Sequence, residues 1–138
     1  MFLNELFSLE GKVAVAVGAG GVLAGEMSRG FAKAGADVVI VDLNPDAANA
    51  RAEEVRAVGR KALACKADVS RKADIQDALK ATLDTFGRVD IVLNAAGINS
   101  GTPFFEIEET EWQRIVDVDL KSVFLACQVF GKQMVEAG

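Results

Sequence analysis

The 138-residue sequence contains no histidine and no tyrosine, and it has only two cysteines. Without histidine, Ser-His-Asp and Cys-His catalysis are excluded together with most zinc sites, so we expect no metal site. Cys65 and Cys127 lie far apart without Cys-x-x-Cys spacing. This pattern favours a reducing compartment and two unpaired thiols, which we expect to be buried as small hydrophobic side chains.

Basic runs and long apolar runs are missing as well. The net charge is −5 and no cluster of Lys or Arg forms, which argues against a nucleic-acid partner. Residues 1–10 lack the basic start and the apolar run of a signal or membrane-spanning segment. We therefore expect a cytoplasmic protein without a membrane partner. The length and the 51% hydrophobic content predict a single domain, residues 1–138, with a sizeable core.

The most informative stretch reads as a strand, a glycine turn and a helix. Residues 13–17 are apolar without polar alternation, which is typical of a parallel strand buried on both faces. Gly18, Gly20 and Gly21 follow, and free amides at the start of a helix beside glycines suit a phosphate group. A tight turn without a ligand explains the glycines equally well. An amphipathic helix is predicted from the apolar residues at helical spacing: Leu23, Met27, Phe31 and Ala34.

The second predicted strand, residues 37–42, ends in a carboxylate. Asp42 stands where a dinucleotide-binding fold holds the hydroxyls of the adenosine ribose. A carboxylate there would repel a 2′-phosphate, and neither Leu43 nor Asn44 supplies a compensating cation. The sequence therefore favours NAD over NADP.

Helices and strands continue to alternate beyond Asp42. We expect a helix from the Asn44 cap to about Gly59, a strand at 61–68, a helix from a Ser70 cap to about Phe86, and a strand at 87–94. This order predicts an α/β fold of the Rossmann type, with a doubly wound parallel sheet and helices on both faces. The charged face of the first of these helices is interpreted as solvated and without function: Arg51, Glu53, Glu54 and Arg56.

The carboxyl ends of parallel strands meet at one edge of a sheet, where such folds bind ligands. Residues that follow all four predicted strands should gather there, and this grouping strengthens the dinucleotide hypothesis. The candidate cofactor-binding residues are Gly18, Gly20, Gly21, Leu23, Asp42, Leu43, Asp68, Val69, Asn94, Ala95, Ala96 and Gly97.

A long helix is predicted after a loop at 99–109 beside the cofactor cleft. Thr110 and Gln113 have capping-box spacing, and the helix should run from about Glu111 towards Gly138. Its residues are apolar on nearly every side, so we expect a homo-oligomer formed through residues 111–136.

Five segments together resemble the short-chain dehydrogenase/reductase family over essentially the whole chain. They are the entry to the first strand at 7–14, the turn at 17–24, the pair Asp68-Val69, Asn94-Ala-Ala-Gly97, and the pattern from Trp112 to Phe124. The resemblance implies a Rossmann-type fold that binds NAD(P) and serves hydride transfer between alcohol and carbonyl groups. It also implies that this sequence is the amino-terminal, cofactor-binding portion, truncated after the fourth strand and the long interface helix.

The sequence departs from the family pattern at several positions. Val22 and Ala24 stand where the family has glycine, and Val17 replaces a threonine. A valine side chain in this turn should narrow the approach of the backbone to a pyrophosphate, which we expect to weaken binding without abolishing it. Asp119 occupies the position of the family's helical asparagine, and a carboxylate cannot donate a hydrogen bond as an amide does.

The resemblance places the catalytic serine and the Tyr-x-x-x-Lys motif beyond Gly138, and the sequence holds no tyrosine. No residue here is a certain catalytic group, so we expect the chain to be inactive alone, to need a complementing carboxyl-terminal half, and to leave its fourth strand as an apolar edge. Two alternatives stay open: a free-standing, non-catalytic nucleotide-binding module, and a module whose activity is self-association.

Overall fold

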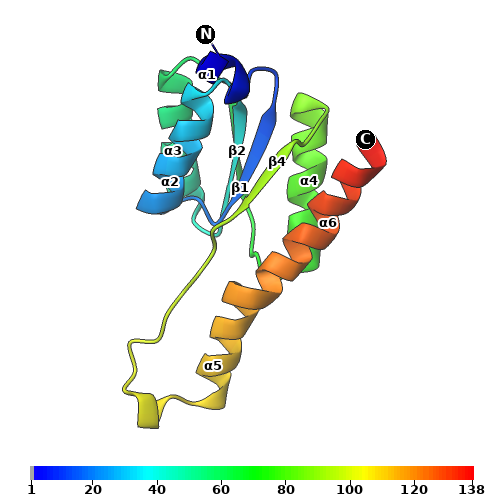
Figure 1. Cartoon of the computed structure of the whole chain (residues 1–138). Helices are drawn as coiled ribbons and strands as arrows, with labels where there is room; N and C mark the ends of the chain where they lie inside the picture. The colour runs from blue at the N-terminus through cyan, green and yellow to red at the C-terminus, as the bar shows by residue number, and fades with distance from the viewer. Residues whose placement is uncertain (1) are drawn as a thin grey trace.

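The computed structural model describes residues 2–138, apart from the side chain of Asn4. Helices and strands alternate through the first two thirds of the chain, and a long helix ends it (Figure 1). In chain order the elements are α1 (Phe2–Leu6), β1 (Val13–Val17), α2 (Val22–Lys33), β2 (Asp37–Asp42), α3 (Pro45–Ala57), β3 (Ala62–Lys66), α4 (Lys72–Phe86), β4 (Ile91–Asn94), the 3-10 turn η1 (Phe104–Glu106), α5 (Glu109–Val116), the π-helical segment η2 (Asp117–Lys121) and α6 (Ser122–Ala137).

The four strands form one parallel sheet in the order β3-β2-β1-β4. Val15 of β1 lies opposite Val39 of β2 on one side and Val92 of β4 on the other. Helices α2 and α3 cover one face, and α4 and α6 cover the other (Figure 1). The predicted doubly wound α/β fold is confirmed, and β4 is the predicted edge strand.

Side chains of alternate residues in the central strands pack into two separate hydrophobic cores, one on each face of the sheet. The valines of β1 point towards α4 and α6, where Phe130 is fully buried. Ala16 and Ile40 point the other way, towards alanines of α2 and α3. Because both faces are covered, every residue of β1 is buried, which is why this strand shows no polar alternation.

Helix α2 exists as predicted, but a different face of it is buried. Its buried residues are small ones, Ala24, Gly25, Ser28 and Ala32, whereas the side chain of Leu23 is 77% exposed. Small residues let α2 approach the sheet and α3 closely, and the Ser28 hydroxyl is satisfied by the Ala24 carbonyl. The apolar stripe predicted at Leu23 and Met27 therefore faces solvent.

The long carboxyl-terminal helix differs from the prediction in its start and its packing. It begins at Glu109, with Glu108 as the cap residue and no side-chain cap, so the predicted capping box is wrong. The Gln113 amide instead donates to Asp117, one turn ahead. Helix α6 packs against α4 and β4, while α5 projects away from the sheet (Figure 1). Residues 99–116 are called the arm below.

Several boundaries and caps test the remaining predictions. The Asn44 cap is confirmed, since its Oδ1 accepts from the amides of Asp46 and Ala47. The predicted Ser70 cap is wrong, because Arg71 precedes α4 and Ser70 binds Asp68. Cys127 is exposed and Cys65 half-buried, so the prediction of two buried thiols is wrong as well.

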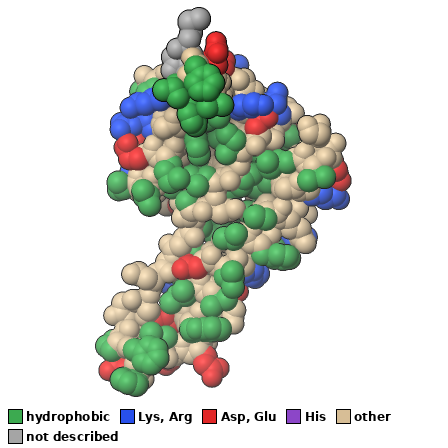
Figure 2. Space-filling view, viewed as in Figure 1, with side chains coloured by type: hydrophobic (Ala, Val, Ile, Leu, Met, Phe, Trp, Pro, Cys, Tyr) green, Lys and Arg blue, Asp and Glu red, His purple; other side chains and the backbone are tan. Residues whose placement is uncertain are grey.

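Exposed apolar side chains gather at both ends of the molecule. They cluster around α1, which has no counterpart among the predicted elements, and again at the tip of the arm (Figure 2). Phe105 at that tip is 98% exposed. Among residues 2–138, no helix combines the length and apolar character needed to cross a bilayer.

Candidate cofactor-binding site

A pocket of about 650 Å³ lies at the carboxyl edge of the sheet. All candidate residues from the sequence line it, apart from Gly20 and Asn94. The lining residues are Gly18, Gly21, Val22, Leu23, Ala24, Asp42, Leu43, Asp68, Val69, Ser70, Ala95, Ala96, Gly97, Ile98, Arg114 and Val118. The volume falls within the roughly 300–1,000 Å³ of typical ligand sites.

Gly18 joins β1 to the turn and touches the fourth-strand motif. Its φ is +77°, and a Cβ added there would lie 2.4 Å from the Cα of Ala96. The amides of Gly18 and Ala19 both donate to the carbonyl of Val41, at 2.7 and 3.2 Å. Only glycine combines this left-handed backbone with so close an approach, so Gly18 packs the turn against its neighbours.

Gly21 has the opposite surroundings. It is the cap residue of α2, with an ordinary φ of −75°, and a Cβ added there would meet nothing within 4 Å. The amides of the first turn of α2 have no partner inside the helix and begin beside this open position. Val22, whose side chain is 74% exposed, stands at the same mouth. The arrangement offers backbone donors and a positive helix end to an anion in the pocket.

Asp42 holds the turn as well as facing the pocket. Its Oδ2 accepts from the Gly20 amide at 2.8 Å, and its Oδ1 accepts from the Asn44 amide at 2.9 Å. A Cβ on Gly20 would lie 2.7 Å from the Asp42 Cγ, so Gly20 packs behind the pocket. A carboxylate has about four acceptor positions, which leaves Asp42 able to accept further hydrogen bonds.

Asp68 and Ser70 close the pocket at the end of β3. The Asp68 Oδ1 accepts from both the Ser70 amide and the Ser70 hydroxyl, at 2.9 and 2.6 Å. The hydroxyl bond is the chief reason that the pKa of Asp68 lies below its ordinary value. Sequence reasoning missed Ser70 as a lining residue; its position two residues after an aspartate in a turn is the signal that could have indicated it.

Asn94 is turned towards α6 and does not line the pocket. Its Nδ2 lies 3.6 Å from the Cys127 Sγ, and its Oδ1 is buried without a hydrogen-bond partner among the described residues. The next residue continues the sheet edge, since the Ala95 amide donates to the Val17 carbonyl at 2.9 Å.

Asp119 connects the long helix to the end of β4. Its Oδ1 accepts from the Ile98 amide at 2.8 Å. As an acceptor, the carboxylate makes the contact that an amide oxygen would make at this position. Three other lining residues were not among the candidates: Ile98, Arg114 and Val118. Ile98 follows the fourth-strand motif directly, so its place in the chain could have indicated it. Arg114 of α5 and Val118 of η2 reach the pocket only through the path of the long helix, which leaves no local signal.

The fold, the pocket at the strand ends and the open helix start define an α/β protein of the dinucleotide-binding class. The model of the short chain dehydrogenase family matches residues 12–138. This chain therefore belongs to the short-chain dehydrogenase/reductase family.

Individual relatives agree with this assignment. D-threitol dehydrogenase of Mycolicibacterium smegmatis is 36% identical over 96% of this chain and 51% of its own length. A short-chain type dehydrogenase/reductase from Mycobacterium marinum superposes with a TM-score of 0.94 at 32% identity, over 99% of this chain and 56% of that one. A 7α-hydroxysteroid dehydrogenase complexed with NADH and 7-oxo glycochenodeoxycholic acid has a TM-score of 0.92 at 32% identity, over 100% and 54%. The chain spans about half the length of the curated relatives it matches.

Proposed function

We propose that this chain binds a nicotinamide dinucleotide as the cofactor-binding part of an oxidoreductase. Membership of the family supports the proposal, as does the likeness to a dehydrogenase structure that holds NADH. When bound, the dinucleotide would accept a hydride from an alcohol, which becomes a carbonyl group, or supply one in the reverse direction. The residues of this chain bind and orient it.

One observation carries the proposal: the amides that start α2, which lack partners inside the helix, begin at the pocket beside Gly21, where an added Cβ would meet none of the described atoms within 4 Å. A pyrophosphate needs such donors and such a close backbone approach. Asp42, at the same edge, keeps acceptor positions for ribose hydroxyls. The proposed cofactor-binding residues are the candidates named from the sequence, with Gly20 and Asn94 acting from behind the pocket wall.

The preference for NAD over NADP rests on Asp42. Its carboxylate would repel a 2′-phosphate, and Leu43 beside it offers no charge. Among residues 2–138, Arg114 is the one basic residue of the pocket lining, and it stands on α5 rather than at the end of β2. We expect NADH to bind at least roughly tenfold more tightly than NADPH.

Calorimetric titration with NADH and NADPH tests both statements. Asp42→Asn keeps the shape of the side chain and one acceptor oxygen, so it disturbs the Gly20 contact less than alanine would. We expect it to narrow the gap between the two ligands. Asp46→Asn, in the exposed first turn of α3, removes the same charge away from the pocket and serves as the control. No NADH binding at millimolar concentration would contradict the proposed function, and tighter NADPH binding would contradict the NAD preference.

Catalysis requires groups from outside these 138 residues. The sequence holds no tyrosine to exchange a proton with substrate, and Asp119 is engaged with the Ile98 amide. We propose that a complementing carboxyl-terminal half supplies the proton-transfer groups and most of the substrate pocket. Mixing this chain with such a half should give NAD-dependent oxidation that neither part shows alone. Free thiols in the described residues favour a cytoplasmic location, which fractionation of cells would test.

A self-associating module is the second candidate function. It is favoured by the exposure of large apolar side chains on the long helix, among them Trp112 at 59%, Leu120 at 67% and Phe124 at 60%. Exposed apolar surface of this kind marks interfaces. We propose a homo-oligomer formed through residues 111–136. Sedimentation velocity should then show a concentration-dependent dimer or larger species, and a monomer at high concentration would contradict it.

A further inference from the structure

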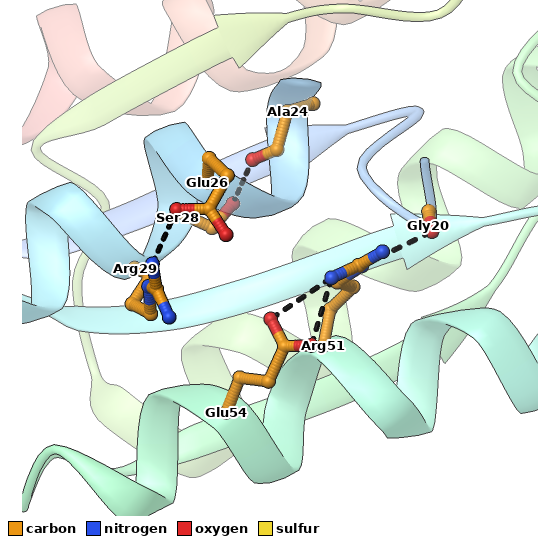
Figure 3. A network of polar contacts seen from close by, with 7 residues as sticks. All are labelled: Gly20, Ala24, Glu26, Ser28, Arg29, Arg51 and Glu54. Carbon is orange, nitrogen blue, oxygen red and sulfur yellow. Dashed lines mark hydrogen bonds and ion pairs between the residues drawn. The ribbon is translucent and has the colours of Figure 1, made fainter. Parts of the chain in front are cut away.

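Arg51 of α3 reaches across to the glycine turn, although the sequence pattern indicated a solvated side chain. Its Nε donates to the Gly20 carbonyl at 3.3 Å, and its Nη1 pairs with both carboxylate oxygens of Glu54 at 2.7 and 3.0 Å (Figure 3). The Arg51 side chain is 20% exposed, whereas Glu53 on the same helix is 72% exposed. The interpretation of this face as uniformly solvated is therefore wrong at Arg51.

The Arg51 contact is the second of two side-chain hydrogen bonds to Gly20. Asp42 accepts from the Gly20 amide, and Arg51 donates to the Gly20 carbonyl. That carbonyl and the Gly21 N–H belong to the same peptide group. A hydrogen bond to the oxygen polarises the group and strengthens its N–H as a donor. Gly21 lines the pocket, so these two hydrogen bonds hold the backbone at the place where an anion would bind.

Gly25 provides the space that Arg51 occupies. A Cβ added at Gly25 would lie 2.5 Å from the Arg51 Cδ and 2.7 Å from its Nε. Glycine in a helix interior costs roughly 1 kcal/mol relative to alanine. Gly25 is buried within α2, so the missing side chain has a packing reason: it lets the arginine cross from α3 to the turn.

We propose that Arg51 is a positioning residue that holds the Gly20–Gly21 peptide ready for the pyrophosphate of a dinucleotide. The inference rests on the proposed function and adds a residue that does not line the pocket. Arg51 acts through the turn, so its loss should weaken every ligand that carries a pyrophosphate by the same factor. NADH and NADPH should suffer equally, and adenosine, which lacks phosphate, should bind as before.

Two variants remove the contact in different ways. Arg51→Met keeps an apolar side chain beside Gly25 and deletes the guanidinium. Gly25→Ala leaves Arg51 in the sequence but displaces its side chain, while the helix gains propensity. Arg29→Met is the matched control, because Arg29 is 40% exposed and pairs with Glu26 of the same helix (Figure 3). Titrations of NADH, NADPH and adenosine, melting curves, and the ¹⁵N–¹H signal of Gly21 would be measured for all three and for the double variant.

We expect NADH and NADPH affinity to fall roughly tenfold in Arg51→Met and in Gly25→Ala, and no further in the double variant. Adenosine affinity should be unchanged, the melting temperature of Gly25→Ala equal or higher, and the Gly21 signal shifted in both variants. Unchanged NADH binding in both, or an equal loss for adenosine, would overturn the inference and leave the proposed function standing. If the parent protein binds no NADH, the proposed function fails. In that case an unchanged Gly21 signal in both variants would overturn the inference as well. A shifted Gly21 signal would support the part of the inference that concerns the turn, namely that Arg51 holds the Gly20–Gly21 peptide.

Discussion

The carboxyl edge of the sheet and the arm are both built from loops and helix ends, yet they are held in different ways. At the edge, loops are fixed by long-range bonds, such as Gly20 to Asp42 and Ile98 to Asp119, above a buried core. Helix α5 of the arm has no buried residue. The comparison indicates that burial stabilises the site, whereas the arm depends on its own local hydrogen bonds.

Glu111 makes the main local bonds of the arm. Its carboxylate accepts from the hydroxyls of Ser100 and Thr102, at 2.5 and 2.9 Å, and so ties the loop to α5. The Ser100 hydrogen bond, followed by the one from Thr102, lowers the pKa of Glu111. This arrangement orders the segment but removes little apolar surface from water, which explains how Phe104 and Phe105 stay exposed.

Truncating a core residue under the edge should have the largest effect. Phe130 is fully buried between α6 and the sheet, so Phe130→Ala should destabilise the fold by about 3–5 kcal/mol through lost transfer energy and a cavity. Urea unfolding followed by circular dichroism would measure the loss. A cost below about 1 kcal/mol would contradict the assignment of this face as the main core.

Alanine substitutions at two glycines of the turn should have different effects on unfolding free energy and on NADH affinity. Gly18→Ala puts a Cβ against Ala96 at a φ of +77°, so it should cost at least about 2 kcal/mol of unfolding free energy. Gly21→Ala meets open space at an ordinary φ, so its stability should change by less than about 0.5 kcal/mol while NADH affinity falls. Thermal melts and NADH titration of both variants would check this. Equal effects of the two changes on stability would refute the distinction.

The sequence was sufficient to predict the edge because its signals are local. Strands without polar alternation and the Asn44 cap could be recognised from the order of residues alone. The parallel topology then brought the candidate residues after each strand to one edge of the sheet. The roles within the edge were harder, since Gly18, Gly20 and Gly21 look alike until their neighbours are known. Gly18 packs against Ala96, Gly20 packs against Asp42, and Gly21 faces the pocket.

One physical reason explains why neither the arm nor the contact between Arg51 and the glycine turn could be predicted. Arg51 has the spacing of a solvated helix residue, and only the crossing of α2 and α3 beside Gly25 brings it to the turn. The capping box at Thr110 was wrong because the helix starts two residues earlier than predicted, at Glu109. The nearby hydroxyls of Ser100 and Thr102 bind Glu111. Tertiary contacts decided between residues that local patterns treat as equivalent.

A smaller effect is expected from the polar bonds of the edge. Ser70→Ala removes the hydroxyl bond to Asp68, which should cost about 0.5 kcal/mol at neutral pH because the pair is partly solvated. The pKa of Asp68 is lowered in the folded protein, so the bond contributes fully above the unfolded pKa of about 3.9 and is lost as pH falls through the lower folded value. The stability gap between parent and variant should therefore shrink below about pH 4. Urea midpoints measured between pH 7 and pH 3 would reveal a constant gap if this assignment is wrong.

The smallest effect should come from the tip of the arm, where Phe105 is 98% exposed and contacts Phe104 edge-on, with ring centroids 5.4 Å apart. Phe105→Ala removes little buried area, so the unfolding free energy should stay within about 0.5 kcal/mol of the parent value. Chemical unfolding at two protein concentrations provides the measurement. A cost above about 1 kcal/mol that grows with concentration would mean that a second chain covers the arm in solution. The contrast between a buried edge and an exposed arm would then hold only for the isolated chain, and self-association would become the better supported of the two candidate functions.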